Sequence, residues 1–339
     1  MEKFLKSRYK IGELIGENPF SITYKGYLIG TQVPVVIKIY KRAALNSPLI
    51  NKLRPKVTKI ISLDHPNIAR VIDGDYGWQG FYFIREFVEG ESLKEMFAKG
   101  VPEMPAALEI MKQVLSSVAT AHKENLIHGA ITTSNIFIAG GGEVKVTDFI
   151  LEPGVRKSPE LLAEAAATGS SFMSPEQIKG EQIGVTSDIY SLGILFYQLL
   201  TGRSPFNGVG GLDTALGHIT EIPLPPSQLS SSIPQYLDDI ILKMLEKDPL
   251  QRISRIEDVL ESMNKHRLIF RAPDQDYVDL IYEDNLNPIV YDEEVVTKKE
   301  KPKTKWRKIS RRSLFSLLVL ISIAVGLWLA FIVNFVSLK

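Results

Sequence analysis

The pattern of apolar and polar residues changes about ninety residues from the start of the chain. Before that point apolar and polar residues alternate in short runs, as expected for half-buried strands. The predicted strands are Lys10–Ile15, Ile22–Leu28, Pro34–Tyr40 and Phe81–Phe87. After that point apolar residues recur at three- and four-residue spacing, which predicts amphipathic helices. The sequence therefore predicts an α+β protein in which a β-rich part precedes an α-rich part.

Two helices of the α-rich part have boundaries that the sequence marks. Pro105–His122 carries apolar residues at the spacing of one helix face. Asp188–Thr201 is strongly apolar, with Ser187 as the candidate N-cap and Gly202 as the stop signal. These features predict two helices that form part of a buried core.

An uninterrupted run of uncharged, mostly apolar residues fills positions 313–338. A helix needs about 20 such residues to cross the hydrocarbon core of a bilayer. A core helix is the alternative, but cores seldom need an apolar run of this length. We therefore predict a single transmembrane helix over residues 313–338, in contact with membrane lipid.

The formal net charge of +1 is the sum of two opposite blocks. Residues 298–312, the basic collar, carry nine Lys or Arg and one Glu, and residues 1–297 are net negative. Basic residues beside a span stay on the cytoplasmic side, so we expect a single-pass protein of the cell membrane with residues 1–297 in the cytoplasm. Residues 267–312 are predicted to be a linker whose basic juxtamembrane segment can contact anionic lipid. The alternative is that the basic collar stays in solvent and only sets the orientation of the membrane span. Nucleic-acid binding is not expected.

The absence of cysteine excludes several kinds of chemistry. Disulfides, a thiol nucleophile and a cysteine-ligated metal are ruled out. The histidines show no zinc-ligand spacing, and no nucleophile-elbow sequence is present.

A series of short motifs between residues 9 and 265 resembles the protein kinase family. The motifs, in order, are IGELIGENPFSITYKG, VVIK, LDHPNI, FIREFVEGESL, LIHGAITTSNIFI, VTDFI, MSPEQ, TSDIYSLGILFYQLLTGRSPF and DPLQRIS. In their residues and order, these motifs are similar to those of bacterial (eukaryotic-like) serine/threonine kinases with a membrane span after the kinase domain. The resemblance implies a bilobal kinase-like domain over residues 1–266, with a β-rich N-lobe to about residue 88 and an α-helical C-lobe over 89–266.

The resemblance also implies a site for ATP and Mg²⁺, whose binding stays open. Lys38 would contact phosphates, Gly16 would belong to the phosphate loop and Glu86 to the hinge that faces adenine. Asn135 and Asp148 would hold the metal through oxygen ligands. The alternative is that Asn135 and Asp148 persist as hydrogen-bonding supports.

Two positions depart from the family in ways that affect catalysis. Ala130 stands where the family has the aspartate that accepts the substrate proton, and no Asp or Glu occurs from Asn125 to Gly142. Losing a general base typically slows a reaction by about 10²–10⁴. Lys56 stands where the family has the helix-C glutamate that orients the phosphate-binding lysine, and the adjacent Pro55 predicts a helix that starts late or is distorted.

Further departures surround the expected nucleotide. Asn18 and Ser21 replace two of the three glycines of the phosphate loop, which hinders close approach of backbone N–H groups to phosphates. Val36 and Phe137 narrow the adenine slot, and Arg85 occupies the gatekeeper position just before the hinge. Together these side chains predict weakened or absent nucleotide binding.

The positions that support the kinase fold, by contrast, match the family. They include an apolar stack between the lobes, an acid that holds the catalytic loop and an ion pair of the large lobe. In that order they are His128, Phe149, Ile60 and Val71; Asp188; and Glu176 with Arg252.

This pattern of a kept fold with a damaged site predicts a membrane-anchored, catalytically impaired pseudokinase. No catalytic residue is assigned. We expect a signalling scaffold or allosteric module whose partner is an unidentified signalling protein or kinase. The alternatives are an active, atypical serine/threonine kinase that transfers the γ-phosphate of ATP to protein hydroxyls, and a non-catalytic ATP sensor.

Overall fold

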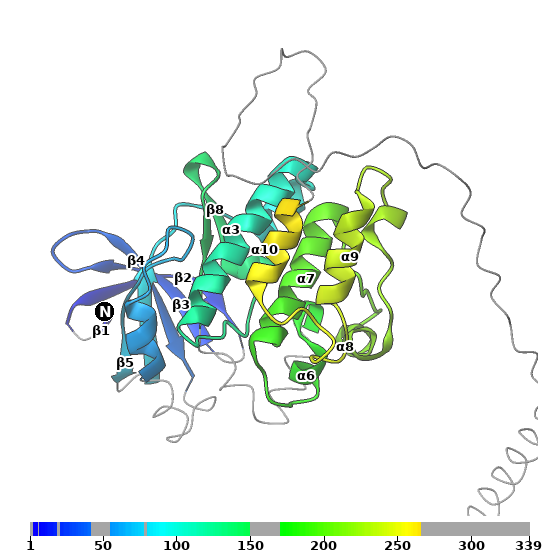
Figure 1. The fold of residues 1–339 in the computed structure, drawn as a ribbon. Coiled ribbons are helices and arrows are strands. Elements are labelled where there is room, and N and C mark those ends of the chain that lie inside the picture. Colours follow the sequence, from blue (N-terminus) through cyan, green and yellow to red (C-terminus); the bar gives the residue numbers. More distant parts are fainter. Residues whose placement is uncertain are drawn as a thin grey trace, which may run out of the picture. The chain divides into compact units, whose positions relative to one another are not determined.

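The structure is a computed structural model that describes residues 3–5, 7–18, 21–41, 55–77, 80–149 and 170–265. These residues form a β-rich N-lobe followed by a helical C-lobe (Figure 1), which confirms the α+β prediction. The predicted linker and transmembrane helix lie outside the described residues. Among the helices that are described, none is long and apolar enough to cross a membrane.

The N-lobe is built on an antiparallel sheet of six strands in the order β1-β2-β3-β4-β6-β5. Its strands are β1 (Lys3–Leu5), β2 (Tyr9–Glu17), β3 (Ser21–Leu28), β4 (Pro34–Tyr40), β5 (Val71–Gly77) and β6 (Gly80–Glu86). A helical segment over residues 55–61 precedes β5 and buries Val57 and Ile60. The strand β5 was not predicted, because two aspartates and a glycine at its centre break the apolar alternation.

The register between β4 and β6 decides which side chains share a face of this sheet. Lys38 lies opposite Phe83 and Val36 lies opposite Arg85. Because alternate residues of a strand share a face and directly paired residues point the same way, Lys38, Val36 and Arg85 lie on one face. Ile37 belongs to the other face, where it joins a separate apolar cluster.

A second sheet of three strands, β7-β8-β9, carries the segments of the expected site. Its strands are β7 (Gly90–Ser92), β8 (Ile136–Ala139) and β9 (Val144–Val146). The short 3-10 helix η2 (Thr133–Asn135) leads into β8, and η3 (Gly140–Gly142) joins β8 to β9. Ile68 forms an isolated bridge with Val146, so the turn after the helical segment of the N-lobe is hydrogen-bonded to this sheet.

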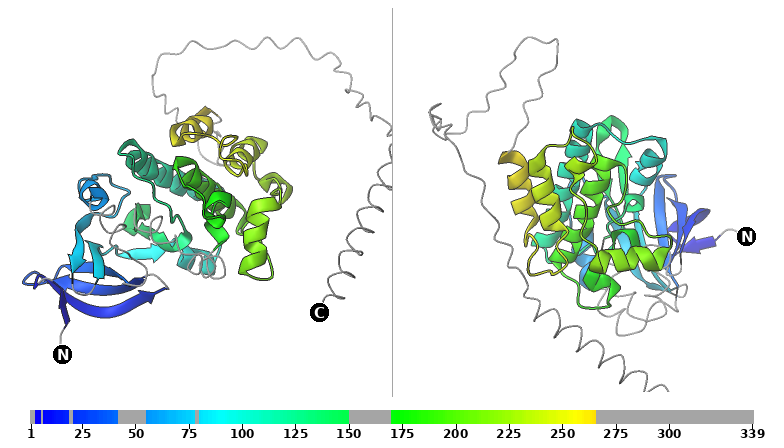
Figure 2. Two further views of the ribbon diagram at one scale, coloured as in Figure 1. Left: turned by 90° about the horizontal axis from the view of Figure 1, so that it is seen from below. Right: turned by 90° about the vertical axis from the view of Figure 1, so that its right-hand side faces the viewer.

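The C-lobe packs its helices around one buried helix. Figure 2 shows α3, α7, α9 and α10 side by side, and α7 contacts both α3 and α9. The elements of this lobe are α2 (Leu93–Lys99), α3 (Met104–Lys123), η4 (Ser170–Phe172), α6 (Pro175–Ile178), α7 (Val185–Thr201), α8 (Gly211–Thr220), η5 (Pro226–Gln228), α9 (Gln235–Met244) and α10 (Ile256–Lys265). Most residues of α7 are buried, which matches its apolar sequence.

The predicted start of α7 was wrong, whereas its end is confirmed. The helix begins at Val185 with Gly184 as N-cap, so Ser187 lies inside the first turn. There the Ser187 hydroxyl accepts a hydrogen bond from the Gly184 N–H at 3.1 Å. Ser187 therefore satisfies a backbone donor at the start of the helix, although Gly184 is the N-cap residue. Gly202 ends the helix in a left-handed conformation (φ 74°), which glycine adopts without a Cβ clash.

Candidate functional site

The loop that precedes η2 and carries Ala130 is held in place by Asp188, in the first turn of α7. One carboxylate oxygen accepts the N–H of Gly129 at 2.7 Å, and the other accepts the N–H of His128 at 2.8 Å. His122 Nε2 lies 2.8 Å from the same carboxylate. Asp188 is 1% exposed, so these contacts fix the backbone beside Ala130, as predicted.

The apolar stack between the lobes is also present. The rings of His128 and Phe149 are 4.5 Å apart, and His128 Nε2 lies 3.0 Å from the carbonyl oxygen of Thr147. Ile60, Val71 and Phe149 belong to one buried cluster. The lobes therefore share a continuous core at this point.

Ala130 presents no proton acceptor to the site. It is buried, its N–H donates to His128 Nδ1 at 3.2 Å, and its carbonyl oxygen accepts from Asn135 Nδ2 at 2.9 Å. The hydrogen-bonding groups of Ala130 are thus used to shape the loop. The side chain at the position of the family's base is only the methyl group of Ala130.

Lys38 has an ionic partner, but it is not on the helical segment of residues 55–61. Lys38 Nζ lies 2.9 Å from Asp148 Oδ2, and Lys38 is only 4% exposed. Lys56 is half-buried, and burial lowers its pKa. Among the described residues no carboxylate forms an ion pair with Lys56, so this helical segment contributes no anion to the site. The described part of the helix begins at Pro55; the residues just before it lie outside the described part of the chain.

Asp148 is gripped by two cations. Besides Lys38, Arg85 places its Nε 3.3 Å from Asp148 Oδ1. Burial alone would raise the pKa of Asp148, but the charges of Lys38 and Arg85 hold that pKa well below its usual range. Asp148 also adopts a left-handed backbone conformation, φ 64°, which is uncommon for a residue other than glycine. Asp148 is therefore an ionised carboxylate whose two oxygens are both engaged.

Arg85 fills the space between Asp148 and the hinge. Its Nη1 donates to the carbonyl oxygen of Glu86 at 3.1 Å, and its guanidinium carbon lies 5.8 Å from the centre of the Phe137 ring. The residue is 6% exposed. The sequence identified Arg85 as the gatekeeper, but its contact with Asp148 was not predicted. The signal in the sequence was a cation at the gatekeeper position; the register of β4 and β6 places it on the same face of the sheet as Lys38.

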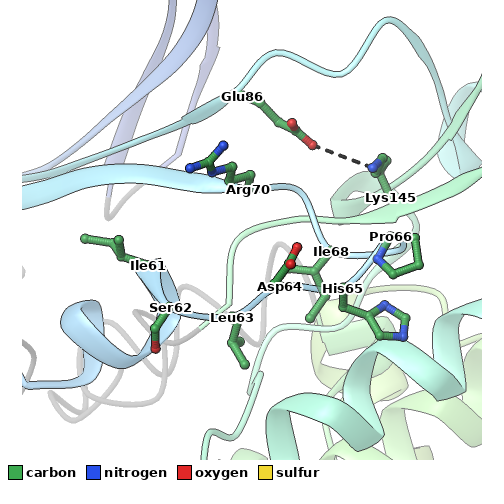
Figure 3. A pocket seen from close by; sticks show the side chains of 10 residues that line it. All are labelled: Ile61, Ser62, Leu63, Asp64, His65, Pro66, Ile68, Arg70, Glu86 and Lys145. Atoms are coloured by element: carbon green, nitrogen blue, oxygen red, sulfur yellow. Dashed lines mark ion pairs between the residues drawn. The ribbon is translucent and has the colours of Figure 1, made fainter.

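The side chain of Glu86 points to the other side of the hinge, because it follows Arg85 on the same strand. It lines a pocket of about 430 Å³ together with Arg70, Lys145 and the turn around His65. Figure 3 shows the side chains of Glu86 and Lys145 pointing toward each other at this pocket. Lys145 Nζ lies 3.9 Å from Glu86 Oε1. The backbone carbonyl of Glu86, the predicted hinge residue, contacts Arg85, whereas its side chain lines the pocket.

The phosphate-loop turn is closed by its own side chains. Asn18 Oδ1 accepts hydrogen bonds from the N–H of Ser21 at 2.7 Å and from its hydroxyl at 3.2 Å. Ser21 is 1% exposed. An N–H that a glycine-rich loop would offer to phosphate is here used within the turn. Gly16 lies nearby in β2, opposite Thr23.

The residues present do not fit a metal-bound nucleotide well. Lys38 and Asp148 are brought together, and Asn135 is held by its hydrogen bond to Ala130. A divalent cation at Asp148, however, would meet the positive charges of Lys38 and Arg85. Like charges at such short range in a buried site repel strongly. The site therefore has the family's lysine and carboxylate but not its charge balance.

The predicted ion pair of the large lobe is formed. Arg252 donates from Nη1 and Nη2 to the two oxygens of Glu176 at 2.8 and 2.9 Å, and both side chains are buried. Ser187 adds a hydrogen bond to Glu176 at 2.7 Å. This network joins α6 to the start of α7 and to the loop before α10.

Comparison with known proteins supports the same family. Residues 9–269 match the protein kinase domain. The chain is 34% identical over 259 residues to the serine/threonine-protein kinase PrkC of Bacillus subtilis, which covers 76% of this chain and 40% of PrkC. It is 32% identical over 265 residues to the probable serine/threonine-protein kinase CPE1738 of Clostridium perfringens, covering 78% of this chain and 39% of that protein. The chain thus spans about two-fifths of the length of these bacterial relatives.

The solved structures agree on the fold. The kinase domain of Mycobacterium tuberculosis PknI superimposes with a TM-score of 0.62 at 18% identity, covering 77% of this chain and 97% of the PknI structure. The family uses ATP and Mg²⁺ in general, and its fold is the bilobal one described above. The match over residues 9–269, with the buried contacts of Asp188 and the Glu176–Arg252 pair, shows that this chain belongs to the protein kinase family.

Proposed function

We propose that this protein is a membrane-anchored pseudokinase that acts as a signalling scaffold or allosteric module. The fold of a serine/threonine kinase is kept, and the chemistry of phosphate transfer is lost. The surface of the kinase fold then serves to bind a partner protein. The partner is a signalling protein or another kinase.

The observation that carries the proposal is the buried methyl group of Ala130. The loop around it is held by Asp188 and closed by the hydrogen bond from Asn135, so its backbone is fixed without a carboxylate at the base position. Removing a positioned general base costs about 10²–10⁴ in rate. The half-buried Lys56 adds a second defect, because it cannot orient Lys38.

Anchoring to the membrane is a separate part of the proposal. The uncharged run over residues 313–338 and the basic collar over residues 298–312 support it. Alkaline extraction of a membrane fraction tests it directly, since a transmembrane protein stays with the lipid and a peripheral one is released. Deletion of residues 313–338 is expected to move the chain to the soluble fraction.

A second candidate is an active, atypical kinase. It is favoured by the contact between Lys38 and Asp148, by the retained Asn135, and by relatives that are named as kinases. In that case water would take the proton that Ala130 cannot accept.

Phosphate incorporation by the purified full-length chain separates the two candidates. The assay uses radiolabelled ATP with Mg²⁺ and a generic protein substrate, and it includes Lys38→Ala as control. A pseudokinase shows the same background in the wild type and in Lys38→Ala. Incorporation by the wild type that disappears in Lys38→Ala would establish the active kinase instead.

A further inference from the structure

We infer that Arg85 is an internal ligand of the nucleotide site. Its guanidinium takes the place of the metal at Asp148 and closes the slot beside the hinge, so that Mg²⁺ and nucleotide bind together only when this side chain is removed. The inference deepens the proposed function and rests on it in one respect, because both concern the same nucleotide site. It concerns binding and does not depend on Ala130.

The position of Arg85 follows from the register of the sheet. Arg85 lies opposite Val36 on the face that also carries Lys38. Because Val36 is two residues from Lys38 on one strand, the side chains of Arg85 and Lys38 lie on the same side of the sheet. Both therefore point toward the segment that holds Asp148.

The contacts of Arg85 connect the two parts of the expected nucleotide site. Nε reaches the metal-binding carboxylate of Asp148 at 3.3 Å, and Nη1 reaches the hinge carbonyl of Glu86 at 3.1 Å. The guanidinium lies beside the ring of Phe137, at the floor of the adenine slot. One buried side chain thus occupies the route from the hinge to the metal position.

The charges explain why this arrangement excludes the metal. Asp148 is the carboxylate that both Lys38 and Arg85 contact, so the three side chains together carry a net positive charge. A divalent cation would have to displace a buried guanidinium from a carboxylate that it contacts. Burying that guanidinium without its anion is unfavourable, which keeps Arg85 in place.

The experiment compares ATP binding by the full-length wild type and by Arg85→Met, with Mg²⁺ and with EDTA, by titration calorimetry. The apparent affinity of a site falls in proportion to the fraction of molecules in which it is open, about tenfold for one molecule in ten. Because Arg85 is buried and paired with Asp148, we expect Arg85→Met to bind ATP with Mg²⁺ at least about tenfold more tightly than the wild type. Arg70→Met, at an exposed arginine near the hinge, is the matched control and should equal the wild type.

The wild type alone also decides the question, should the variants fail to fold. We expect its ATP affinity to be the same in Mg²⁺ and in EDTA, or binding to be undetectable in both. Tighter binding in Mg²⁺ than in EDTA would overturn the inference. Arg85→Gln is a second variant, which keeps hydrogen-bond donors but removes the charge. Its ATP affinity should become dependent on Mg²⁺. Equal ATP affinities for Arg85→Met, Arg85→Gln and the wild type would also overturn the inference.

The outcomes separate this inference from the proposed function. Wild type that binds ATP more tightly with Mg²⁺ than with EDTA but transfers no phosphate would overturn the role of Arg85 and leave the pseudokinase proposal standing. Transfer by Arg85→Met, without transfer by the wild type, would support the role of Arg85. It would also show that Ala130 is not the decisive defect.

Discussion

The carboxylate of Asp188 accepts the backbone N–H of Gly129 at 2.7 Å, although the two residues are 59 positions apart in the chain. Gly129 has a positive φ of 70°, a conformation that is costly for other residues. Glycine adopts this conformation without strain, so the buried acid holds in place a loop that has Ala130 at the position of the family's base. The contacts that hold this loop use the backbone of Ala130 and do not involve its side chain.

Asp188→Ala should destabilise the protein strongly. It leaves the N–H groups of His128 and Gly129 buried without an acceptor, at about 1–3 kcal/mol each. We expect the melting temperature of the full-length chain to fall by roughly 5–10 °C. Asp239→Ala, at an exposed position of α9, should change it little. Equal melting temperatures for the two variants would contradict this role of Asp188.

The Glu176–Arg252 pair should make stability depend on pH. Burial alone would raise the pKa of Glu176, but the hydrogen bonds and charge of Arg252 lower it below its usual value. A carboxylate whose folded pKa lies below its unfolded value stabilises the protein above the unfolded pKa, about 4.3, and loses this contribution as the pH falls through the folded pKa.

Glu176→Gln tests this expectation. At pH 7 the variant should be less stable than the wild type by about 3 kcal/mol, because a buried arginine loses its anion. The difference in melting temperature should shrink as the pH is lowered from 5 to about 3. Glu261→Gln, at an exposed ion pair with Lys265, is the control and should leave the melting temperature nearly unchanged. A difference for Glu176→Gln that stays constant with pH would refute the prediction.

Ala130→Asp should restore activity only where Arg85 is also replaced. In the wild-type background Asp148 stays engaged by Lys38 and Arg85, so a new carboxylate at position 130 finds no correctly bound nucleotide. In the Arg85→Met background the same change should raise phosphate incorporation by about 10²–10⁴. The matched control is Ala106→Asp, an exposed position of α3, in the same background. No gain over Arg85→Met alone would show that the missing base is not limiting.

Gly26→Ala should destabilise the N-lobe sheet. A Cβ at Gly26 would lie 2.7 Å from the carbonyl oxygen of Lys10 and 2.5 Å from Ile37 Cδ1. Such overpacking costs about 1–3 kcal/mol. At Gly16 the nearest atom, Thr23 Cβ, would be 3.9 Å away, so Gly16→Ala should leave the melting temperature nearly unchanged. Similar losses for both variants would show that the strand rather than the contact at Gly26 is sensitive.

Several features of the fold could be predicted because they depend on local periodicity. The strand Pro34–Tyr40 and the long helix α3 have the expected bounds to within a residue or so. The first turn of α7 was misjudged, since a serine inside a first turn and a serine at the cap leave the same signal in the sequence. The residues that support the loop, such as Asp188, were identified through the order of the motifs.

The sequence by itself determined the class of fold, the missing base at Ala130 and the reversed charge at Lys56, because each is a property of residue type and spacing. Only the tertiary structure decided which charges meet. Arg85 and Asp148 are 63 residues apart, and Lys38 and Asp148 are 110 apart. Their contacts depend on how the sheet of one lobe faces the loop of the other. Periodicity describes which side of an element is buried, whereas pairing across the chain follows from how those buried sides pack together.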